Sequence, residues 1–245
     1  MEDRLKFLDL SQRLSPTTPR SSDHPEVRFA VLRHYSTHGT LTREIHSSLH
    51  SGTHVDAPTL YIPGGKNVDE IPLEDFCGSG VVIDYSKLGD WGVMTSELLD
   101  ETAGEVREGD ILALYTGWGE YYRTDEERYM LRHPGLDRSG VDWLIRRKVK
   151  AVYSDTPSSE HIFMRSRQWK VLRPDVFGSL DIDPEQFPPA YAHKQLLPAG
   201  IQMVEHLSEA LGELVGQRVN LAAFPAKYAG VEAAPARVVA VLEFP

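Results

Sequence analysis

The segment from His50 to Pro58 constrains the fold of this chain more than any other stretch. Its sequence, His-Ser-Gly-Thr-His-Val-Asp-Ala-Pro, sets two imidazoles and one carboxylate around a glycine. Imidazole nitrogen and carboxylate oxygen are the ligands that zinc and similar divalent metals prefer. Three such ligands with room left for water make a hydrolytic site, because the metal lowers the pKa of bound water towards neutrality. We therefore predict that His50, His54 and Asp56 bind a divalent metal.

The same segment is not expected to be helical, although His50 and His54 have the spacing of one helical face. Gly52, its β-branched neighbours and the closing proline all disfavour a helix. We predict a strand that ends near His50, a turn around Gly52, and then an extended piece in which His54 and Asp56 point to the same side. Gly52 lets the backbone fold back and bring His50 to the same point. The alternative is a polar surface loop with chance histidines.

Length and composition are those of an intracellular enzyme. The 245 residues can bury a large core, as one large domain or two small ones. The net charge of −10, without any cluster of lysine or arginine, argues against nucleic acid as a partner. Cys77 is the single cysteine, so no internal disulfide can form and a cytoplasmic location is expected. We interpret Cys77 as a small apolar side chain rather than a nucleophile. No apolar run predicts a secretion signal or a membrane helix.

Apolar runs alternate with short amphipathic helices, which predicts an α/β or α+β fold with a central sheet. Strands are expected at Lys6–Leu10, Val27–His34, Leu41–Leu49, Gly80–Tyr85, Ile111–Tyr115, Ala151–Tyr153, Ile201–Leu207, Val219–Phe224 and Arg237–Phe244, the second and third as a potential hairpin. Helices are expected after Thr95 or Ser96, after Ser139, and near Ser208–Leu214. The segment Pro157–Pro189 has few periodic apolar positions, so we interpret it as a long functional loop or lid over the site.

A second group of polar residues lies downstream, around Glu205. On the predicted strand, Glu205 shares a face with the apolar Ile201, Met203 and Leu207. A carboxylate on an apolar face is costly unless something such as a metal ion neutralises it. His206 would fall on the opposite face and is the less favoured ligand. The alternative is a glutamate at a solvated strand end or paired with an arginine.

The chain resembles the metal-dependent cyclase-like hydrolases of the kynurenine formamidase and isatin hydrolase type. His50–Pro58 is similar to the family signature His-x-Gly-Thr-His-x-Asp-x-Pro. The resemblance runs nearly end to end, and the other similar segments are Asp9–Ser11, Leu14–Pro16, Gly109–Gly119, His133–Leu136, Tyr153–Thr156, His193 with Glu205, and Ala234–Arg237. The first signature is specific, and the others count only in combination.

The resemblance implies a function and a fold. His50, His54 and Asp56 match the ligands of one metal, and His193 and Glu205 match the pair that completes a second site, with Asp56 shared. One or two ions per chain, Zn²⁺ or Mn²⁺, are implied. The implied fold is a single compact α/β domain over residues 1–245, in which a mixed sheet closes into a barrel-like core of the swivelling β/β/α type, flanked by short helices. A homodimer or homotetramer is also implied.

Two departures from the family pattern bear on the substrate. The family signature ends in a proton-transferring histidine, where this chain has Leu60. Leu60 cannot move a proton, and a poor leaving group such as an amide nitrogen needs a general acid. The second departure follows Pro19. The family often carries an aromatic residue of the substrate pocket after this proline, whereas this chain has Arg20. Both changes argue against kynurenine formamidase itself and suggest a more polar or anionic substrate, which Arg20 would contact.

Other residues are considered for the missing acid or base. His161 and Glu160 lie in the proposed lid and are the preferred candidates, against a structural or surface role. Tyr61 would face away from the site on a strand, and His46 would share the face of His50. Trp118, with the tyrosines that follow it, is a candidate wall of the substrate pocket, with core packing as an equal alternative.

The sequence thus predicts a metal-dependent hydrolase that opens an amide, imide, lactone or ester bond of a small molecule. The first alternative is a metal-dependent lyase or cyclase acting on a small carbonyl compound, in which the metal stabilises an enolate. The second alternative is a metal-bearing protein that lost catalysis with the histidine now replaced by Leu60. No membrane partner is expected.

Overall fold

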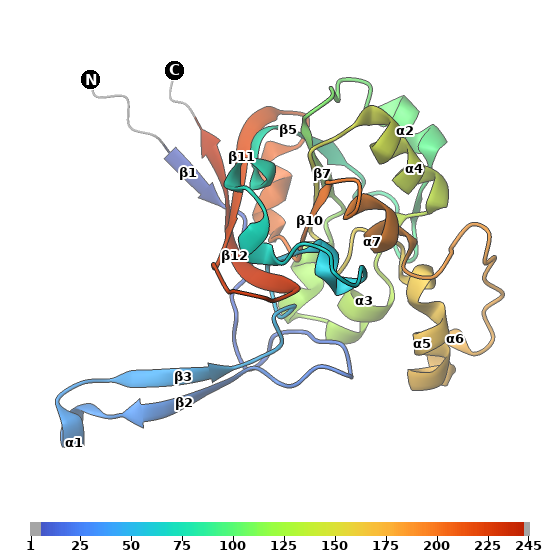
Figure 1. Cartoon of the computed structure of the whole chain (residues 1–245). Helices are drawn as coiled ribbons and strands as arrows, with labels where there is room; N and C mark the ends of the chain where they lie inside the picture. Colours follow the sequence, from blue (N-terminus) through green and yellow to red (C-terminus); the bar gives the residue numbers. More distant parts are fainter. Residues whose placement is uncertain (1–5, 243–245) are drawn as a thin grey trace, which may run out of the picture.

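Within residues 6–242, which the computed structural model describes, seven strands close into a barrel (Figure 1). The strands of the chain are β1 (Lys6–Asp9), β2 (Arg28–Arg33), β3 (Thr42–His46), β4 (His54–Asp56), β5 (Cys77–Asp84), β6 (Val93–Met94), β7 (Ile111–Tyr115), β8 (Gly135–Leu136), β9 (Ala151–Ser154), β10 (Gln202–Glu205), β11 (Arg218–Pro225) and β12 (Ala233–Leu242). The α-helices are α1 (Tyr35–His38), α2 (Ser96–Thr102), α3 (Glu126–Leu131), α4 (Arg138–Arg147), α5 (Ser166–Leu172), α6 (Pro174–Phe177) and α7 (Tyr191–Leu196). Short 3₁₀ helices lie at Pro58–Leu60, Val68–Glu70, Leu73–Phe76, Trp118–Arg123, Ile162–Arg165 and Glu209–Leu214. The last two residues of the strand predicted to end at Phe244 lie outside the described residues.

The order around the barrel is β12, β11, β5, β7, β9, β10 and β4, and the pairing of β4 with β12 closes it. β5, β7, β9 and β10 run parallel to one another, and the remaining pairs are antiparallel. Parallel neighbours need long crossover connections, which here include α2, α4 and α7. β12 is long enough to pair with β4 near its start and with β1 near its end. The predicted α/β fold with a mixed, barrel-like sheet is confirmed.

Apolar cores lie on both sides of the barrel wall. Side chains such as Val82, Ile111 and Val204 fill its interior. Their neighbours along the same strands, among them Val81 and Leu112, face outwards and pack beneath α2, α4 and α7. The period of two along each strand produces this division. Where these helices cover the sheet, a side chain on its outer face lies between the two layers.

The helix caps agree with the sequence prediction at one helix and differ at another. Thr95 caps α2, as predicted, by accepting a hydrogen bond from the amide of Leu98. Asp137, and not Ser139, caps α4: its Oδ1 accepts from the amide of Gly140 at 3.0 Å. The Ser139 hydroxyl donates to the same oxygen at 2.7 Å. Serine and aspartate are equally good caps, so their order in the sequence could not decide between them.

The segment predicted as a loop or lid over residues 157–189 is partly helical. It contains α5, α6 and the 3₁₀ turn before them. The prediction of a loop is wrong here because Trp169 and Phe177 pack with Trp118 in a third, aromatic cluster. These widely spaced aromatic residues supply the burial that the sequence period did not reveal. The segment nevertheless borders the site described below, through Pro157 and Arg165.

β2 and β3 form the predicted hairpin, which projects from the barrel with α1 near its tip (Figure 1). All residues of both strands are exposed. β3 ends at His46, so the prediction of a strand up to His50 is wrong; the chain turns as it leaves the hairpin and enters the barrel. No helix between residues 6 and 242 combines the length and apolarity needed to cross a bilayer.

Candidate metal centre

β4 carries two polar side chains on the outer face of the barrel. Val55 points into the interior core, so its neighbours His54 and Asp56 must point outwards, as the alternation predicted. The Nε2 atom of His54 lies 3.3 Å from Oδ1 of Asp56. In the antiparallel pairing of β10 with β4, Glu205 stands directly opposite His54, and its Oε2 lies 3.9 Å from His54 Nε2. Two neighbouring strands thus direct three ionisable groups to one point.

His50 reaches this point through the turn that the sequence predicted. Gly52 adopts φ +69°, a left-handed conformation, and a Cβ atom there would meet the Tyr122 hydroxyl at 3.2 Å. Nδ1 of His50 lies 3.0 Å from Oδ1 of Asp56 and 3.1 Å from Nε2 of His54. The other ring nitrogen of His54, Nδ1, lies 2.9 Å from the Gly52 carbonyl oxygen. Since a carbonyl can only accept, His54 Nδ1 carries the proton and Nε2 offers its lone pair to the site.

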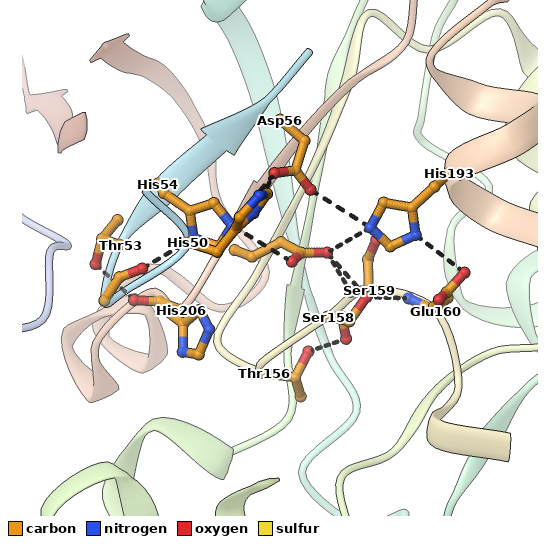
Figure 2. A network of polar contacts seen from close by, with 12 residues as sticks. His50, Thr53, His54, Asp56, Thr156, Ser158, Ser159, Glu160, His193 and His206 are labelled. Atoms are coloured by element: carbon orange, nitrogen blue, oxygen red, sulfur yellow. Dashed lines mark hydrogen bonds and ion pairs between the residues drawn. The ribbon is translucent and has the colours of Figure 1, made fainter. Parts of the chain in front are cut away.

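The helix α7 brings His193 to the other oxygen of Asp56. Nε2 of His193 lies 3.4 Å from Asp56 Oδ2 and 3.8 Å from Glu205 Oε1. Two sets of potential ligand atoms result, each with its members within 4.8 Å of one another: His50, His54 and Asp56 form one, and Asp56, His193 and Glu205 form the other. Figure 2 shows Asp56 between His50 and His54 on one side and His193 on the other. The five residues predicted as ligands therefore converge.

The segment that follows β9 holds the second set in place (Figure 2). The Ser158 hydroxyl donates to Glu205 Oε1 at 2.9 Å, and the Ser159 amide donates to the same oxygen at 3.2 Å. Oε2 of Glu160 lies 3.1 Å from Nδ1 of His193. This contact is at ion-pair distance without hydrogen-bond geometry. A carboxylate beside the second ring nitrogen of a ligating histidine orients the ring and raises its basicity.

Burial and charge act in opposite directions on the ionisable groups of this site. Burial opposes ionisation of Asp56, but His50 and His54 hold its pKa well below the usual range. Burial, reinforced by the negative charge of Asp56, raises the pKa of Glu205. For His193, burial favours the neutral ring, but Glu160 and Asp56 together raise its pKa well above the usual value. The site is therefore a buried region that favours positive charge.

The residues fit a bound cation. Both carboxylate oxygens of Asp56 are buried and accept no hydrogen bond. The histidine nitrogens approach them within 3.0 and 3.4 Å but not along hydrogen-bond directions. Buried carboxylate oxygens without a donor are costly. A divalent cation between these oxygens and the imidazole nitrogens would remove that cost, and nitrogen and oxygen donors suit Zn²⁺ and Mn²⁺.

A cavity of about 110 Å³ opens beside these ligands. Its polar lining beyond the ligands includes Arg20, His24 and Arg165. Its apolar lining comprises Pro19, Leu60, Tyr61, Met130 and Pro157. Arg20, predicted to contact the substrate, and Leu60 both lie in this lining.

Three predicted pocket or catalytic residues lie outside the cavity lining. His161 is fully buried: its Nε2 lies 3.0 Å from the Trp91 carbonyl, and its Nδ1 accepts from the Phe163 amide, so the structure places its ring away from the cavity. Glu160 contacts His193, with its Oε2 3.1 Å from the Nδ1 atom, and does not line the cavity. Trp118 is 2% exposed and donates its Nε1–H to the Tyr129 carbonyl, so it belongs to the aromatic core. Their proximity in sequence to site residues was misleading because each packs inwards.

Three further predictions about side-chain direction are wrong. Tyr61 lines the cavity, 5.1 Å from the His193 ring between centroids, because Pro58 starts a 3₁₀ turn that ends strand alternation. His206 also lines the cavity, since its φ of +59° breaks the alternation after Glu205. His46, which we had considered on the face of His50, is exposed on the hairpin instead.

The sequence reasoning missed His24 and Arg165. The ring of His24 stacks on that of His50 at 5.9 Å. No local pattern marks either residue, because each reaches the cavity only through the packing of distant segments.

Comparison with known proteins places this site in a family. Residues 8–161 match the family described as "Putative cyclase". The chain belongs to this Cyclase family. It is 25% identical over 237 residues to the kynurenine formamidase of Salinibacter ruber, covering 96% of this chain and 97% of that protein. It is 24% identical over 233 residues to the kynurenine formamidase of Geobacillus thermodenitrificans, covering 94% and 95%.

Solved structures show the same fold. Isatin hydrolase A from Labrenzia aggregata superposes with a TM-score of 0.80 at 25% identity, covering 98% of this chain and 94% of that one. Isatin hydrolase A from Ralstonia solanacearum gives a TM-score of 0.75 at 25% identity, covering 98% and 92%. The kynurenine formamidases and isatin hydrolases among these relatives support the prediction that this Cyclase family member is a hydrolase.

Proposed function

We propose that the protein hydrolyses an amide, imide, lactone or ester bond of a small molecule with one or two divalent metal ions. The observation that carries this proposal is the convergence of two sets of ligand atoms on the shared carboxylate of Asp56, beside a cavity of about 110 Å³. The kynurenine formamidases and isatin hydrolases to which the chain is similar support the same class of reaction.

The residues of the chain have distinct tasks in this reaction. A divalent cation, when bound, polarises the substrate carbonyl and lowers the pKa of water. His50, His54 and Asp56 would hold one ion, and His193 and Glu205 would complete a second site with Asp56. Glu160 and the Ser158 hydroxyl fix the orientation of His193 and Glu205.

The apolar wall of the cavity selects the leaving group. Leu60 and Tyr61 line it together with the candidate ligands. Since Leu60 donates no proton, we expect esters, lactones and activated imides to react faster than plain amides.

Chelation and reconstitution test this function. The protein is stripped with a chelator, reloaded with Zn²⁺ or Mn²⁺, and assayed on a panel of small esters, lactones and formamides. We expect hydrolysis that is lost on stripping and restored by metal, with the esters turned over fastest. Products of dehydration or ring closure would instead indicate a lyase or cyclase, and full metal content without turnover of any compound would indicate a binding protein.

The native metal and the location are part of the same proposal. We propose Zn²⁺ or Mn²⁺, since three imidazoles and two carboxylates suit both ions. Elemental analysis of gently purified protein should give close to two ions per chain. The single cysteine supports a cytoplasmic location.

We also propose that the chain forms a homo-oligomer through the β2–β3 hairpin. An isolated two-stranded hairpin is marginally stable, and this one exposes Phe29, Val31, Leu32, Tyr35 and Ile45. Residues 28–46 carry three arginines and one acidic residue, whereas the whole chain has a net charge of −10. The acidic body of a second copy is therefore the complementary surface. Sedimentation should show a dimer or tetramer that dissociates when Phe29 and Ile45 are changed to serine; a monomeric wild type would contradict it.

A further inference from the structure

We propose that Arg165 binds a carboxylate of the substrate, so that the hydrolysed compound is a small ester or amide with an apolar body and an anionic end. This inference rests on the proposed hydrolytic function and names the class of compound that the site accepts. The position of Arg165, its lack of an acidic partner and the composition of the cavity carry it.

Arg165 is distinct among the arginines of the described chain. Five arginines between residues 6 and 242 are half-buried: Arg20, Arg128, Arg132, Arg165 and Arg173. Four of them have a carboxylate oxygen within 4.0 Å, supplied by Glu26, Asp90, Glu127 or Asp175. Arg165 has none; its one side-chain hydrogen bond is a long contact of 3.5 Å to Gln168 Oε1. Half-buried guanidinium groups commonly pair with a carboxylate. Acidic residues outnumber basic ones in this chain, so the lack of an acidic partner at Arg165 is unexpected.

The nearby acidic group is committed elsewhere. Asp23 is close enough for the charge of Arg165 to help lower its pKa, although burial opposes this and Ser21 contributes more. Its Oδ2, however, accepts from the Gln168 side-chain amide at 2.9 Å. Asp56 and Glu205, the carboxylates of the cavity, lie among the histidines and form no ion pair with Arg165. The guanidinium is thus free to bind an anion that enters the cavity.

The rest of the cavity indicates what the anion is attached to. Besides the candidate ligands and polar side chains such as Ser21 and His24, the lining contains apolar and aromatic side chains, namely Leu60, Tyr61, Met130 and Pro157. Arg20, the other arginine of the cavity, already donates to the His24 carbonyl at 3.0 Å and pairs with Glu26. A planar guanidinium matches the planar carboxylate with two parallel hydrogen bonds. The site therefore suits an aromatic or aliphatic body with its carboxylate on Arg165 and its scissile carbonyl at the metal ligands.

A matched pair of substrates tests this inference on the metal-loaded enzyme. The compounds are 4-acetoxybenzoate and its methyl ester, which share the acetyl group and differ in the distal charge. The variants are Arg165→Met, Arg165→Lys and the control Arg167→Met. The control removes an exposed arginine of α5 that lies two residues along the chain and outside the cavity. Thermal unfolding confirms that each variant is folded.

We expect the wild type to prefer the carboxylate compound. Arg165→Met should lower kcat/KM for it by about tenfold to a hundredfold, mainly through KM, since hydrogen bonds to charged groups are of this strength. For the methyl ester, kcat/KM should fall less than about threefold in the same variant, because this compound has no charge for Arg165 to bind. Arg165→Lys should restore part of the loss, and Arg167→Met should leave both substrates unchanged. Equal losses on the two compounds in Arg165→Met, or no preference in the wild type, would overturn the inference.

Calorimetric titration with 4-hydroxybenzoate separates this inference from the proposed function. We expect the wild type to bind this carboxylate at least tenfold more tightly than Arg165→Met does, whether or not either acetyl ester is hydrolysed. Binding with this difference but without hydrolysis would leave the anion site standing and refute the hydrolase. Equal binding by both proteins would refute the anion site and leave the hydrolase standing.

Discussion

Replacing Asp56 by asparagine should lower kcat/KM for the best ester of the panel by about a thousandfold, which corresponds to about 4 kcal/mol of transition-state stabilisation. Asp56 is the one carboxylate that belongs to both sets of ligand atoms. Its Oδ1 faces His50 and His54, and its Oδ2 faces His193. An amide of the same shape keeps one oxygen but loses the charge, so both metal positions are weakened at once. The metal content per chain, measured by elemental analysis, should fall together with the activity.

The matched control is Asp181→Asn, which makes the same chemical change at an exposed position outside the cavity. It should retain full activity and metal content. Circular dichroism should show that Asp56→Asn is folded. The prediction would be contradicted if Asp56→Asn kept its metal and more than about a tenth of its activity. A tenfold loss corresponds to about 1.4 kcal/mol of transition-state stabilisation, too little for a carboxylate at the centre of the site.

Acidification from pH 7 to pH 5 should destabilise the metal-free protein, and His133→Asn should reduce that loss by about 2 kcal/mol. Burial lowers the pKa of His133 to about 3 and that of His161 to about 4. Both rings stay neutral in the folded state, while the unfolded chain binds a proton below a pKa of about 6.5. The stability that they contribute is full above pH 6.5 and is lost as the pH falls towards their folded pKa values. At pH 5, each ring costs about 2 kcal/mol.

Asp155 acts in the opposite direction over part of this range. Burial raises its pKa to about 6, against the hydrogen bonds from Thr116. Its contribution is full at low pH and is lost as the pH rises through 6, so it offsets about 1.4 kcal/mol of the acid effect at pH 5. The contribution of Asp155 cancels when the wild type is compared with His133→Asn, because Asp155 is present in both proteins.

Urea unfolding at pH 7 and pH 5, with a chelator present, measures the effect. Asparagine at position 133 can keep the donor that lies 3.0 Å from the Pro134 carbonyl, now as an amide N–H. His38→Asn, on the exposed helix at the tip of the hairpin, is the control and should leave the difference between the two pH values unchanged. An equal loss in wild type and His133→Asn would show that the buried ring is not responsible.

The local part of the metal site could be predicted from the sequence, because short-range geometry fixes it. A strand has a period of two, so His54 and Asp56 had to share a face, and the left-handed Gly52 lets the chain return to bring in His50. Glu205 could be predicted as a ligand because a carboxylate on an apolar strand face is costly unless it is neutralised. In the structure it lies opposite His54 in the pairing of β10 with β4.

The predictions failed where one residue interrupts a regular period. Pro58 starts a 3₁₀ turn, which moves Tyr61 to the cavity. The positive φ of His206 ends the alternation of β10 and turns its ring to the same cavity. A positive φ at a residue other than glycine is held by its surroundings, here the Thr156 carbonyl and the Thr53 hydroxyl. Such surroundings are not visible in a linear pattern.

The sequence alone determined the donor types of the metal site, the turn around Gly52 and the alternation of strands and helices, since each depends on neighbours in the chain. Only the tertiary structure decided that His193 meets Asp56, that His161 and Trp118 are buried away from the cavity, and that Arg165 reaches the cavity without an acidic partner. The physical reason is that barrel closure and helix packing join segments more than a hundred residues apart. Long-range packing, and not local propensity, sets the direction of each of these side chains.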